Sequence, residues 1–376
     1  MKIFLPDQVL DDKEVERLIE NHQDVTSIFF APTTLETIIH ILALFKKGIP
    51  LCPISPRESS LPELSLPASI CSCLATSGTT GAKFAMHSLE NHLANARSTH
   101  RDLILQKEDG YLVSLPLYHI GGLSLLLRSF LADSNLVLPG GARERVTHSS
   151  FVPTQLKRFL EKKESYPNLR AILLGGAAIP LSLCEEAKDL PLYLTYGMTE
   201  MTSQVATKRF ALEDGINFGY PLPGREVKIG VDGEVFVRGG TLFLGYYGLP
   251  SPLVDGWLPT RDLGCLDENG LTILGRKDRM LISGGENIYP EEIERAFLSL
   301  SEVESVVVSK RIDKEFGERP IAKVWIREAS SSSLLYEKLE RLLVKFKIPY
   351  AEDITVVEGS LEQRGSYQLS WKQGHE

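Results

Sequence analysis

The stretch LATSGTTGAKFAMHS, residues 74–88, is crowded with glycine and hydroxyl residues and carries one lysine, Lys83. It follows a short apolar run and precedes a stretch with helical spacing. In a strand–loop–helix arrangement, successive backbone N–H groups of such a loop can point at an anion, and hydroxyls and a lysine add donors. The spacing is not that of the GxxxxGK(S/T) loop. The stretch predicts a phosphate-binding loop, although a plain flexible turn has the same composition.

Outward from this loop, short apolar runs alternate with helical patterns. A helix is predicted at 33–48, where apolar residues recur at helical spacing and Gly48 ends the run. Another is predicted at 89–105, directly after the loop. Strands are predicted in the apolar runs 71–77, 110–116, 169–177 and 192–197. This alternation favours a parallel α/β sheet covered by helices.

The pattern changes after Gly219. GREVKIGVDGEVFVRGG, 224–240, reads as two alternating strands around an Asp-Gly turn, which predicts an antiparallel or barrel-like part. YPEEIERAFLSL, 289–300, has proline at the first helical position and acids in the first turn, so a small α+β unit follows. The predicted organisation is a large α/β N-terminal domain at 1–275, a hinge at 276–278 and a small mobile α+β domain at 279–376.

Composition excludes several classes of protein. The chain has 376 residues, 43% hydrophobic and 24% charged, as in an ordinary globular protein. A net charge of −8 without a basic block argues against nucleic acid as a partner. No apolar run is long enough for a membrane span, and the first residues do not resemble a signal peptide. Five scattered cysteines predict no disulfide framework, and a cytoplasmic location is expected.

Three later segments carry chemistry. YGMTE, 196–200, places the Thr199 hydroxyl and the Glu200 carboxylate just past a predicted strand, and Mg²⁺ takes such oxygen ligands together with substrate phosphates. WLPTRDLG, 257–264, holds one acid, Asp262, which suits the two hydroxyls of a ribose. GRKDRMLISGGENIYPEE, 275–292, combines Arg276 with a glycine pair that permits close backbone approach to a ligand.

In this order and at these spacings the segments resemble the adenylate-forming superfamily of acyl-CoA synthetases, luciferases and peptide-synthetase adenylation domains, from about residue 25 onward. Within it the chain is most similar to the o-succinylbenzoate–CoA ligases of menaquinone biosynthesis. The residues that carry this similarity are SLPLYHIGGLS (114–124), THSSFVPTQL (147–156), LLGGAAIP (173–180), YGMTE with SQVATK after it (196–208), GYPLPGREVKI (219–229), GRKDRMLISGGENIYPEEIER (275–295) and DKEFGERPIA (313–322).

The resemblance implies a two-step reaction. The substrate carboxylate attacks the α-phosphate of ATP, giving an acyl-adenylate and pyrophosphate, and the thiol of coenzyme A then displaces AMP. Mg²⁺ is the implied metal. The partners are small molecules, and a homo-oligomer is compatible with the sequence.

The resemblance also assigns roles to individual residues. Thr199 contacts the α-phosphate, Glu200 binds Mg²⁺, Asp262 and Arg276 hold the ribose, and Asp278 lies at the hinge. The β- and γ-phosphates are assigned to Thr76, Ser77, Gly78, Thr79, Thr80, Gly81 and Lys83. The adenosine part is assigned to Gly175, Gly176, Ala177, Ala178, Tyr196, Gly197 and Met198, with Tyr196 stacked beside the adenine. Coenzyme A is assigned to Gly284 and Gly285, and the acyl pocket to His119, Thr154, Gln155, Ser203 and Arg225.

Two of these assignments have plainer alternatives. A dicarboxylate such as o-succinylbenzoate keeps one carboxylate unreacted, and a cation such as Arg225 would pair with it. Arg225 could instead be a surface cation beside Glu226, and His119 could be a wall residue.

The sequence departs from the family pattern in three places. Lys83 falls one position early, without the usual proline before it, and the chain is shorter at its start, so a trimmed first subdomain is expected. The position of the family's adenylation lysine holds Tyr367 or Gln368, and Lys372 is the candidate replacement. Losing one preorganised cation at a transition state costs roughly 10²–10³ in rate. Two alternatives to an o-succinylbenzoate–CoA ligase therefore stay open. The chain could be another aryl- or acyl-CoA synthetase, or a degenerate nucleotide-binding protein.

Overall fold

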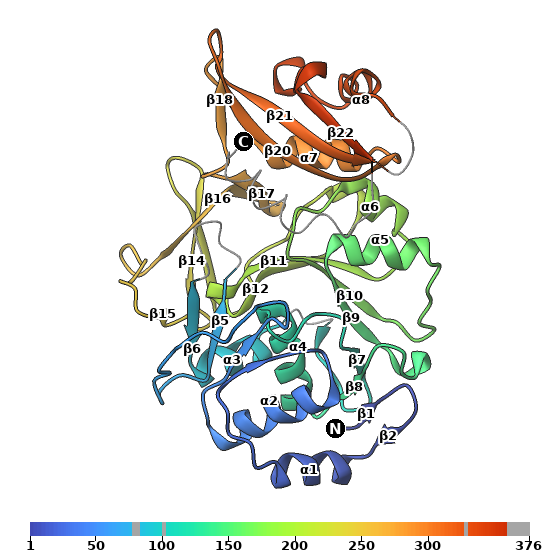
Figure 1. Ribbon diagram of the computed structural model, residues 1–376, viewed down its shortest axis with the longest axis vertical. Helices are drawn as coiled ribbons and strands as arrows, with labels where there is room; N and C mark the ends of the chain where they lie inside the picture. The colour runs from blue at the N-terminus through green and yellow to red at the C-terminus, as the bar shows by residue number, and fades with distance from the viewer. Residues whose placement is uncertain (77–82, 100–102, 327–329, 359–376) are drawn as a thin grey trace.

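The computed structural model describes residues 1–376 except 77–82, 100–102, 327–329 and 359–376. Its centre is an eight-stranded sheet in the order β12-β11-β10-β9-β7-β8-β1-β2 (Figure 1). The inner strands are parallel and the two edge pairs antiparallel, so the predicted parallel α/β sheet is confirmed. The strands are β1 Ile3–Phe4, β2 Val9–Leu10, β7 Gly110–Leu112, β8 Asn135–Val137, β9 His148–Phe151, β10 Ala171–Gly175, β11 Leu192–Met198 and β12 Ser203–Arg209.

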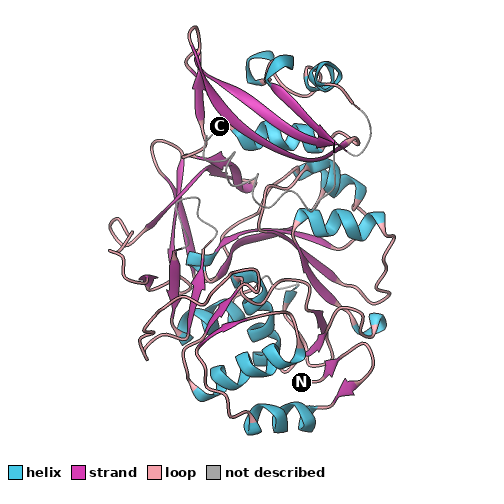
Figure 2. Ribbon diagram, viewed as in Figure 1, coloured by secondary structure: helices cyan, strands magenta, loops and turns pink. Residues whose placement is uncertain are grey.

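Helices pack on both sides of this sheet and make two hydrophobic cores (Figure 2). One core contains residues of α1 Asp12–Asn21, α2 Leu35–Lys47 and α4 Ile120–Leu131. The other contains residues of α5 Pro153–Glu161 and α6 Leu181–Glu186. The helix predicted at 33–48 is confirmed as α2; the Thr34 side chain caps its start, and Gly48 ends it as predicted, at φ 67°.

A small antiparallel sheet holds the glycine-rich stretch. It has the order β15-β6-β5, with β5 Ser72–Ala75, β6 Phe84–His87 and β15 Gly245–Tyr246. The expectation that the loop runs directly into a helix was wrong, because β6 lies between the loop and α3, Leu89–Arg97. The loop therefore connects two antiparallel strands, and α3 begins only after β6. A two-stranded parallel sheet, β3 Ile28–Phe30 with β4 Cys52–Ile54, lies nearby in sequence.

The antiparallel part after Gly219 is confirmed as the four-stranded sheet β13-β14-β16-β17. Its strands are β13 Arg225–Ile229, β14 Glu234–Gly239, β16 Leu258–Asp267 and β17 Gly270–Arg276. The C-terminal unit is a separate sheet with two helices, at the top of Figure 1. Its elements are β18 Leu281–Ser283, β19 Glu286–Ile288, α7 Pro290–Leu298, β20 Val303–Asp313, β21 Gly317–Ile326, α8 Ser332–Leu339 and β22 Ile354–Glu358.

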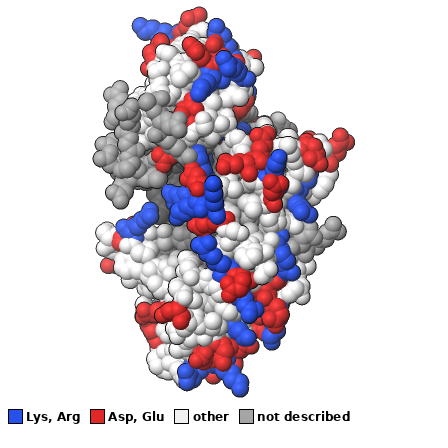
Figure 3. All heavy atoms as spheres, turned by 90° about the vertical axis from the view of Figure 1, so that its right-hand side faces the viewer, with Lys and Arg blue, Asp and Glu red and all other residues white. Residues whose placement is uncertain are grey.

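The change from one sheet to the next falls between Arg276 and Leu281, around the predicted hinge at 276–278. A rotation of the C-terminal unit about that hinge stays a prediction. Within the described ranges, no helix is long and apolar enough to cross a bilayer. On the face drawn in Figure 3, Lys and Arg side chains are interspersed with Asp and Glu.

Candidate active site

A tight turn at the edge of the central sheet presents Thr199 and Glu200. Strand β11 ends at Met198, a single 3-10 turn covers Thr199–Met201, and β12 returns antiparallel. The return uses two consecutive non-glycine residues at positive φ, Thr202 at 51° and Ser203 at 102°. Gly197 faces this turn, and a Cβ there would lie 2.0 Å from the Ser203 carbonyl oxygen. The YGMTE motif thus folds so closely that Gly197 tolerates no side chain.

The hairpin β5–β6 is fastened to this turn through a buried histidine. His87 Nε2 lies 2.7 Å from the Thr199 carbonyl oxygen, which can only accept, so Nε2 carries the proton. The Ser72 hydroxyl then donates to His87 Nδ1 at 3.2 Å and accepts from His92 Nε2 at 2.8 Å. Burial lowers the pKa of His87 to about 4 and that of His92 to about 3, so both imidazoles are neutral near pH 7. The chain of bonds fixes where Thr199 lies relative to β5 and β6, the strands on either side of the glycine-rich loop.

Tyr246 joins the loop to Glu200. Its hydroxyl donates to Glu200 Oε1 at 2.7 Å, and the Lys83 ammonium lies 5.2 Å from the centre of its ring. The two ends of the loop meet, because the Thr76 amide donates to the Lys83 carbonyl at 2.8 Å. Thr76, Lys83 and Glu200 are therefore linked by one series of contacts, and their binding of phosphates and Mg²⁺ stays a prediction. The loop residues between them, Ser77, Gly78, Thr79, Thr80 and Gly81, lie outside the described residues.

The predicted ribose pair and the predicted hinge residue form one charged cluster. Asp262 accepts from the Tyr196 hydroxyl at 2.6 Å and from Arg276 Nη1 at 3.2 Å. The same guanidinium makes two further bonds of 3.1 Å to the Asp278 carboxylate. Burial raises the pKa of Asp262, against the opposing effects of Tyr196 and Arg276. Arg276 thus connects the large domain's acid to the acid at the start of the C-terminal unit.

The residues assigned to the adenine lie next to Tyr196. Gly175 ends β10 opposite Thr195 of β11, and a Cβ on it would come within 2.5 Å of the Thr195 side chain. Gly176 follows at φ 79°, and the exposed Ala177 and Ala178 continue the loop. Stacking of Tyr196 on the adenine stays a prediction.

Arg225 is neither a surface cation nor a partner of Glu226. It is 5% exposed, and Glu226 pairs with Arg238 instead, at 2.6 Å. Its guanidinium donates to neutral acceptors: the backbone carbonyl oxygens of Gln204, Ser98 and Pro223 and the side-chain oxygens of Ser98 and Asn95. Burial, and next the charge of Arg128, lower the pKa of Arg225 to about 9. The surface alternative was wrong, and most donors of Arg225 are already used.

Arg128 is a candidate site residue that the sequence analysis missed. It lies on α4, is 5% exposed, and donates from Nη2 to Gln204 Oε1 at 2.6 Å. Its Nε is buried without a hydrogen-bond partner, and no carboxylate among the described residues pairs with it. Burial lowers its pKa. The available signal was a single cation inside the apolar run IGGLSLLLRSFL, 120–131. Two desolvated arginines therefore flank Gln204, just beyond the turn that carries Thr199 and Glu200.

The other predicted substrate residues are placed less decisively. His119 and Thr154 are exposed at the starts of α4 and α5, and Ser203 is half-buried in the turn. The side-chain oxygen of Gln155 accepts from the backbone N–H of Val152 at 3.0 Å, which caps the start of α5. Its side-chain nitrogen donates to the backbone carbonyl of Ser114 at 2.7 Å. Their contacts with an acid stay predictions.

The glycine pair assigned to coenzyme A forms a hairpin turn. Gly284 and Gly285 connect β18 to β19 at φ 59° and 87°, as a two-residue turn of type I′ requires. Local geometry alone accounts for both glycines, and contact with coenzyme A stays a prediction. Lys372, Tyr367 and Gln368 lie outside the described residues.

Comparison with known proteins gives one consistent result. The family model described as AMP-binding enzyme matches residues 55–247. The 2-succinylbenzoate–CoA ligase of Escherichia coli (strain K12) is 36% identical over 368 residues, which cover 84% of this chain and 80% of the relative. The ligase of the same name from Haemophilus influenzae is 38% identical over 294 residues, which cover 73% of this chain and 64% of the relative.

Two solved structures extend the likeness to the fold. A variant of E. coli MenE with bound OSB-AMS has a TM-score of 0.81 at 30% identity and covers 99% of this chain and 94% of its own. The Bacillus subtilis o-succinylbenzoate CoA synthetase, in complex with the acyl-adenylate intermediate OSB-AMP, has a TM-score of 0.81 at 28% identity, covering 94% and 91%. The chain therefore belongs to the AMP-binding enzyme family, among the 2-succinylbenzoate–CoA ligases.

Proposed function

We propose that this chain converts 2-succinylbenzoate, ATP and coenzyme A into the CoA thioester, AMP and pyrophosphate. In the first step a carboxylate oxygen bonds to the α-phosphorus and the bond to pyrophosphate breaks. In the second step the thiol gives up its proton to solvent, its sulfur bonds to the acyl carbon, and AMP leaves with the electron pair. The names of the relatives and the bound OSB-AMP of the B. subtilis enzyme support this reaction.

The nucleotide end of the site fits ATP with Mg²⁺, the pair bound in another B. subtilis structure. Glu200 and the Thr199 hydroxyl are the oxygen donors that Mg²⁺ prefers, and the metal would neutralise charge on the phosphates. Asp262 would accept from the ribose hydroxyls while Arg276 holds that carboxylate in place. Thr76 and Lys83 would bring the ends of the glycine-rich loop to the phosphates.

The observation that carries the choice of acid is the buried pair Arg128 and Arg225. Two desolvated guanidinium groups without a carboxylate among the described residues are costly unless an anion joins them. A substrate with a second carboxylate supplies that anion. Because neutral acceptors already take most of the donors of Arg225, Arg128 is the cation with more capacity left, and it is our candidate for contact with the unreacted carboxylate.

The test compares two acids in ATP–pyrophosphate exchange. We expect Arg128→Met to raise KM for 2-succinylbenzoate by roughly 10²-fold or more, since one partner of a buried charge pair is lost. The KM for benzoate, which has no second carboxylate, should change little. Arg238→Met, which removes a cation paired at the surface with Glu226, is the control. Equal losses for both acids would leave Arg128 without a role in acid recognition.

The same assay separates the alternatives. A related aryl- or acyl-CoA synthetase would accept benzoate as readily as 2-succinylbenzoate. A degenerate nucleotide-binding protein would bind ATP without exchange. The five free cysteines of the chain fit a reducing compartment, so the proposal includes a cytoplasmic location; a homo-oligomer stays open.

A further inference from the structure

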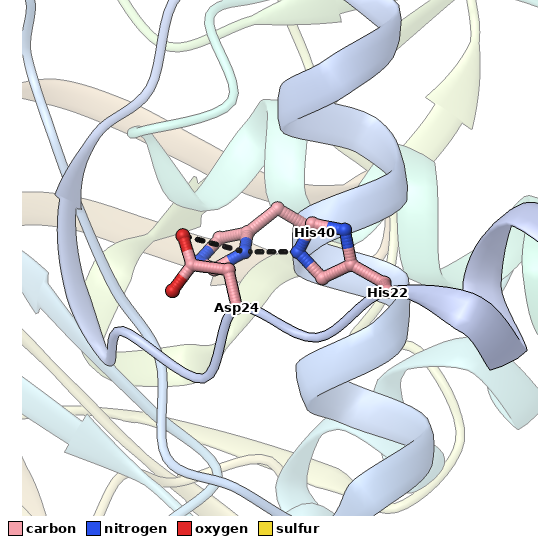
Figure 4. Close-up of side chains that lie close together, drawn as sticks. All are labelled: His22, Asp24 and His40. Atoms are coloured by element: carbon pink, nitrogen blue, oxygen red, sulfur yellow. Dashed lines mark hydrogen bonds and ion pairs between the residues drawn. The ribbon is translucent and has the colours of Figure 1, made fainter.

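Three potential metal ligands meet where the chain passes from α1 to β3, at the end of the molecule opposite the C-terminal sheet (Figures 1 and 4). His22 follows α1, Asp24 lies two residues further on, and His40 stands in the middle of α2. One ligand atom from each lies within 4.8 Å of the others. The distance from His22 Nε2 to His40 Nδ1 is 2.7 Å, and that from His40 Nδ1 to Asp24 Oδ2 is 3.9 Å.

Thr26 prepares two of the three ligands. Its carbonyl oxygen lies 2.9 Å from His40 Nε2 and can only accept, so Nε2 carries the proton and Nδ1 keeps its lone pair for the cluster. Its amide donates to Asp24 Oδ1 at 2.8 Å, which orients the carboxylate with Oδ2 toward His40. Outer partners of this kind are typical of metal-binding histidines and carboxylates.

The contact between the two imidazoles also suits a metal. His22 Nε2 and His40 Nδ1 face each other at 2.7 Å. Without a metal, His22 Nε2 must donate its proton to His40 Nδ1. A cation takes the place of that single shared proton and bonds to both nitrogens.

We propose that His22, Asp24 and His40 bind one divalent transition-metal ion of the zinc class, with water at the fourth position. Imidazole nitrogen with carboxylate oxygen is a donor set that Zn²⁺ accepts and Mg²⁺ does not favour. At Zn–N distances of about 2.0–2.1 Å, tetrahedral ligand atoms lie about 3.3 Å apart. The His22–His40 gap must therefore open by about 0.6 Å, and Asp24 must approach His40 by about as much.

This adjustment falls on the part of the site that can move. His40 is 6% exposed and its ring is held by Thr26 and by the edge of Phe29, at 4.4 Å between ring centres. Asp24 is exposed and His22 half-buried, both on the connection after α1. The Lys47 ammonium bonds to the His22 carbonyl oxygen at 2.5 Å and opposes a cation, but it is exposed and screened by solvent. The bound ion would tie this connection to α2, away from the nucleotide site.

The experiment uses the whole protein with ZnCl₂ as the probe, and MgCl₂ in parallel. Calorimetry should show one Zn²⁺ site that Asp24→Asn and His22→Gln each weaken by about tenfold or more. At Zn²⁺ one hundred times Kd, the unfolding temperature should rise by roughly 3 °C in the parent, and by less in both variants. Co²⁺ should give the visible absorption of a tetrahedral site, and this band should be lost in His22→Gln.

Glu20→Gln is the matched control, because Glu20 is an exposed carboxylate of α1 that pairs with Lys46 and lies outside the cluster. It should bind Zn²⁺ as the parent does. A second, weaker Zn²⁺ at Glu200 would persist in Asp24→Asn and His22→Gln, which distinguishes it from the proposed site. The proposal would be overturned if Asp24→Asn and His22→Gln both kept the Zn²⁺ affinity of the parent while their circular dichroism spectra showed that they are folded.

Discussion

Replacing Asp262 by alanine should affect both nucleotide binding and stability, and the structure separates the two effects. The carboxylate accepts from the Tyr196 hydroxyl at 2.6 Å and from Arg276 at 3.2 Å. Tyr196 is 8% exposed, so Asp262→Ala leaves its hydroxyl buried without that acceptor, at a cost of about 1–3 kcal/mol in unfolding free energy. Arg276 keeps Asp278 as a partner and adds little to this loss. The variant is therefore expected to be folded but less stable.

The effect on ATP is expected to be larger. A carboxylate that accepts from two ribose hydroxyls makes two charge-assisted bonds of about 1.5–3 kcal/mol each. Their loss corresponds to a decrease in ATP affinity of at least roughly 10²-fold. Calorimetry with ATP and Mg²⁺ measures the affinity, and urea unfolding measures the stability.

A second substitution distinguishes the two roles. Asp262→Ala combined with Tyr196→Phe removes the orphaned hydroxyl, so part of the lost stability should return while ATP binding stays weak. Asp267→Ala removes an exposed carboxylate of the same strand β16 that accepts from the Asn269 amide at 2.8 Å; it is the control and should leave ATP affinity unchanged. ATP affinity unchanged in folded Asp262→Ala would refute the assignment of this residue to the ribose.

Three further results are expected. His87→Leu leaves the Thr199 carbonyl without its donor and should slow ATP–pyrophosphate exchange by roughly 10- to 100-fold. His87→Gln can still donate a hydrogen bond and should retain most of the rate. Equal rates in the two variants would argue against a positioning role for His87. Because the pKa values of His87 and His92 lie near 4 and 3 in the folded protein and at 6.5 in the unfolded chain, the unfolded chain binds more protons below pH 6.5. As the pH is lowered from 6.5 to 4, the unfolding free energy should therefore decrease by about 1.4 kcal/mol per pH unit for each histidine. If the unfolding free energy of His92→Leu, measured by urea titration, showed the same dependence on pH as the parent, this prediction would be contradicted. With preformed acyl-adenylate, Lys372→Ala should form thioester at the parental rate, while the full reaction from ATP should fall by about 10²-fold if Lys372 supplies the missing cation. A fast parent that neither Lys372→Ala nor Gln368→Lys changes would remove this segment from the adenylation site.

Local sequence was sufficient for the elements whose signals lie within a few residues. Helix α2 has its cap, its apolar spacing and its terminal glycine in one stretch, and the Asp-Gly hairpin of β13 and β14 carries its own turn. Strand β6 was missed because four residues, FAMH, are too few to show a period. It pairs with β5 across the loop, and its other edge pairs with β15, about 160 residues later, which no local pattern reveals.

The candidate site divides in the same way. Motifs predicted Asp262, Arg276 and Glu200 because each carries its charge at a recognisable spacing, and the structure brings Asp262 and Arg276 together. Tyr246 and Arg128 were missed because their importance comes from partners distant in sequence, Glu200 and Gln204. The hydrogen-bond partners of Arg225 could not be predicted, because they depend on its burial in the fold. Its position beside Glu226 in the sequence does not indicate that its guanidinium donates to backbone carbonyls.

The turn at Thr202 and Ser203 has a consequence for attempts to engineer heat resistance. A residue with a side chain at positive φ lowers the unfolding free energy by about 1–3 kcal/mol. Two such residues follow each other in the chain shortly after Thr199 and Glu200. Thr202 is kept in place by a hydroxyl bond of 2.8 Å to the Thr241 carbonyl oxygen, whereas glycine would adopt the same backbone without strain and without that anchor. A library selected only for survival of heating should therefore accumulate glycine at this turn and lose turnover as it does so. Selection for this scaffold has to reward product formation at every round, because the segment easiest to relax is the one that positions Thr199 and Glu200, the proposed ligands of ATP and Mg²⁺.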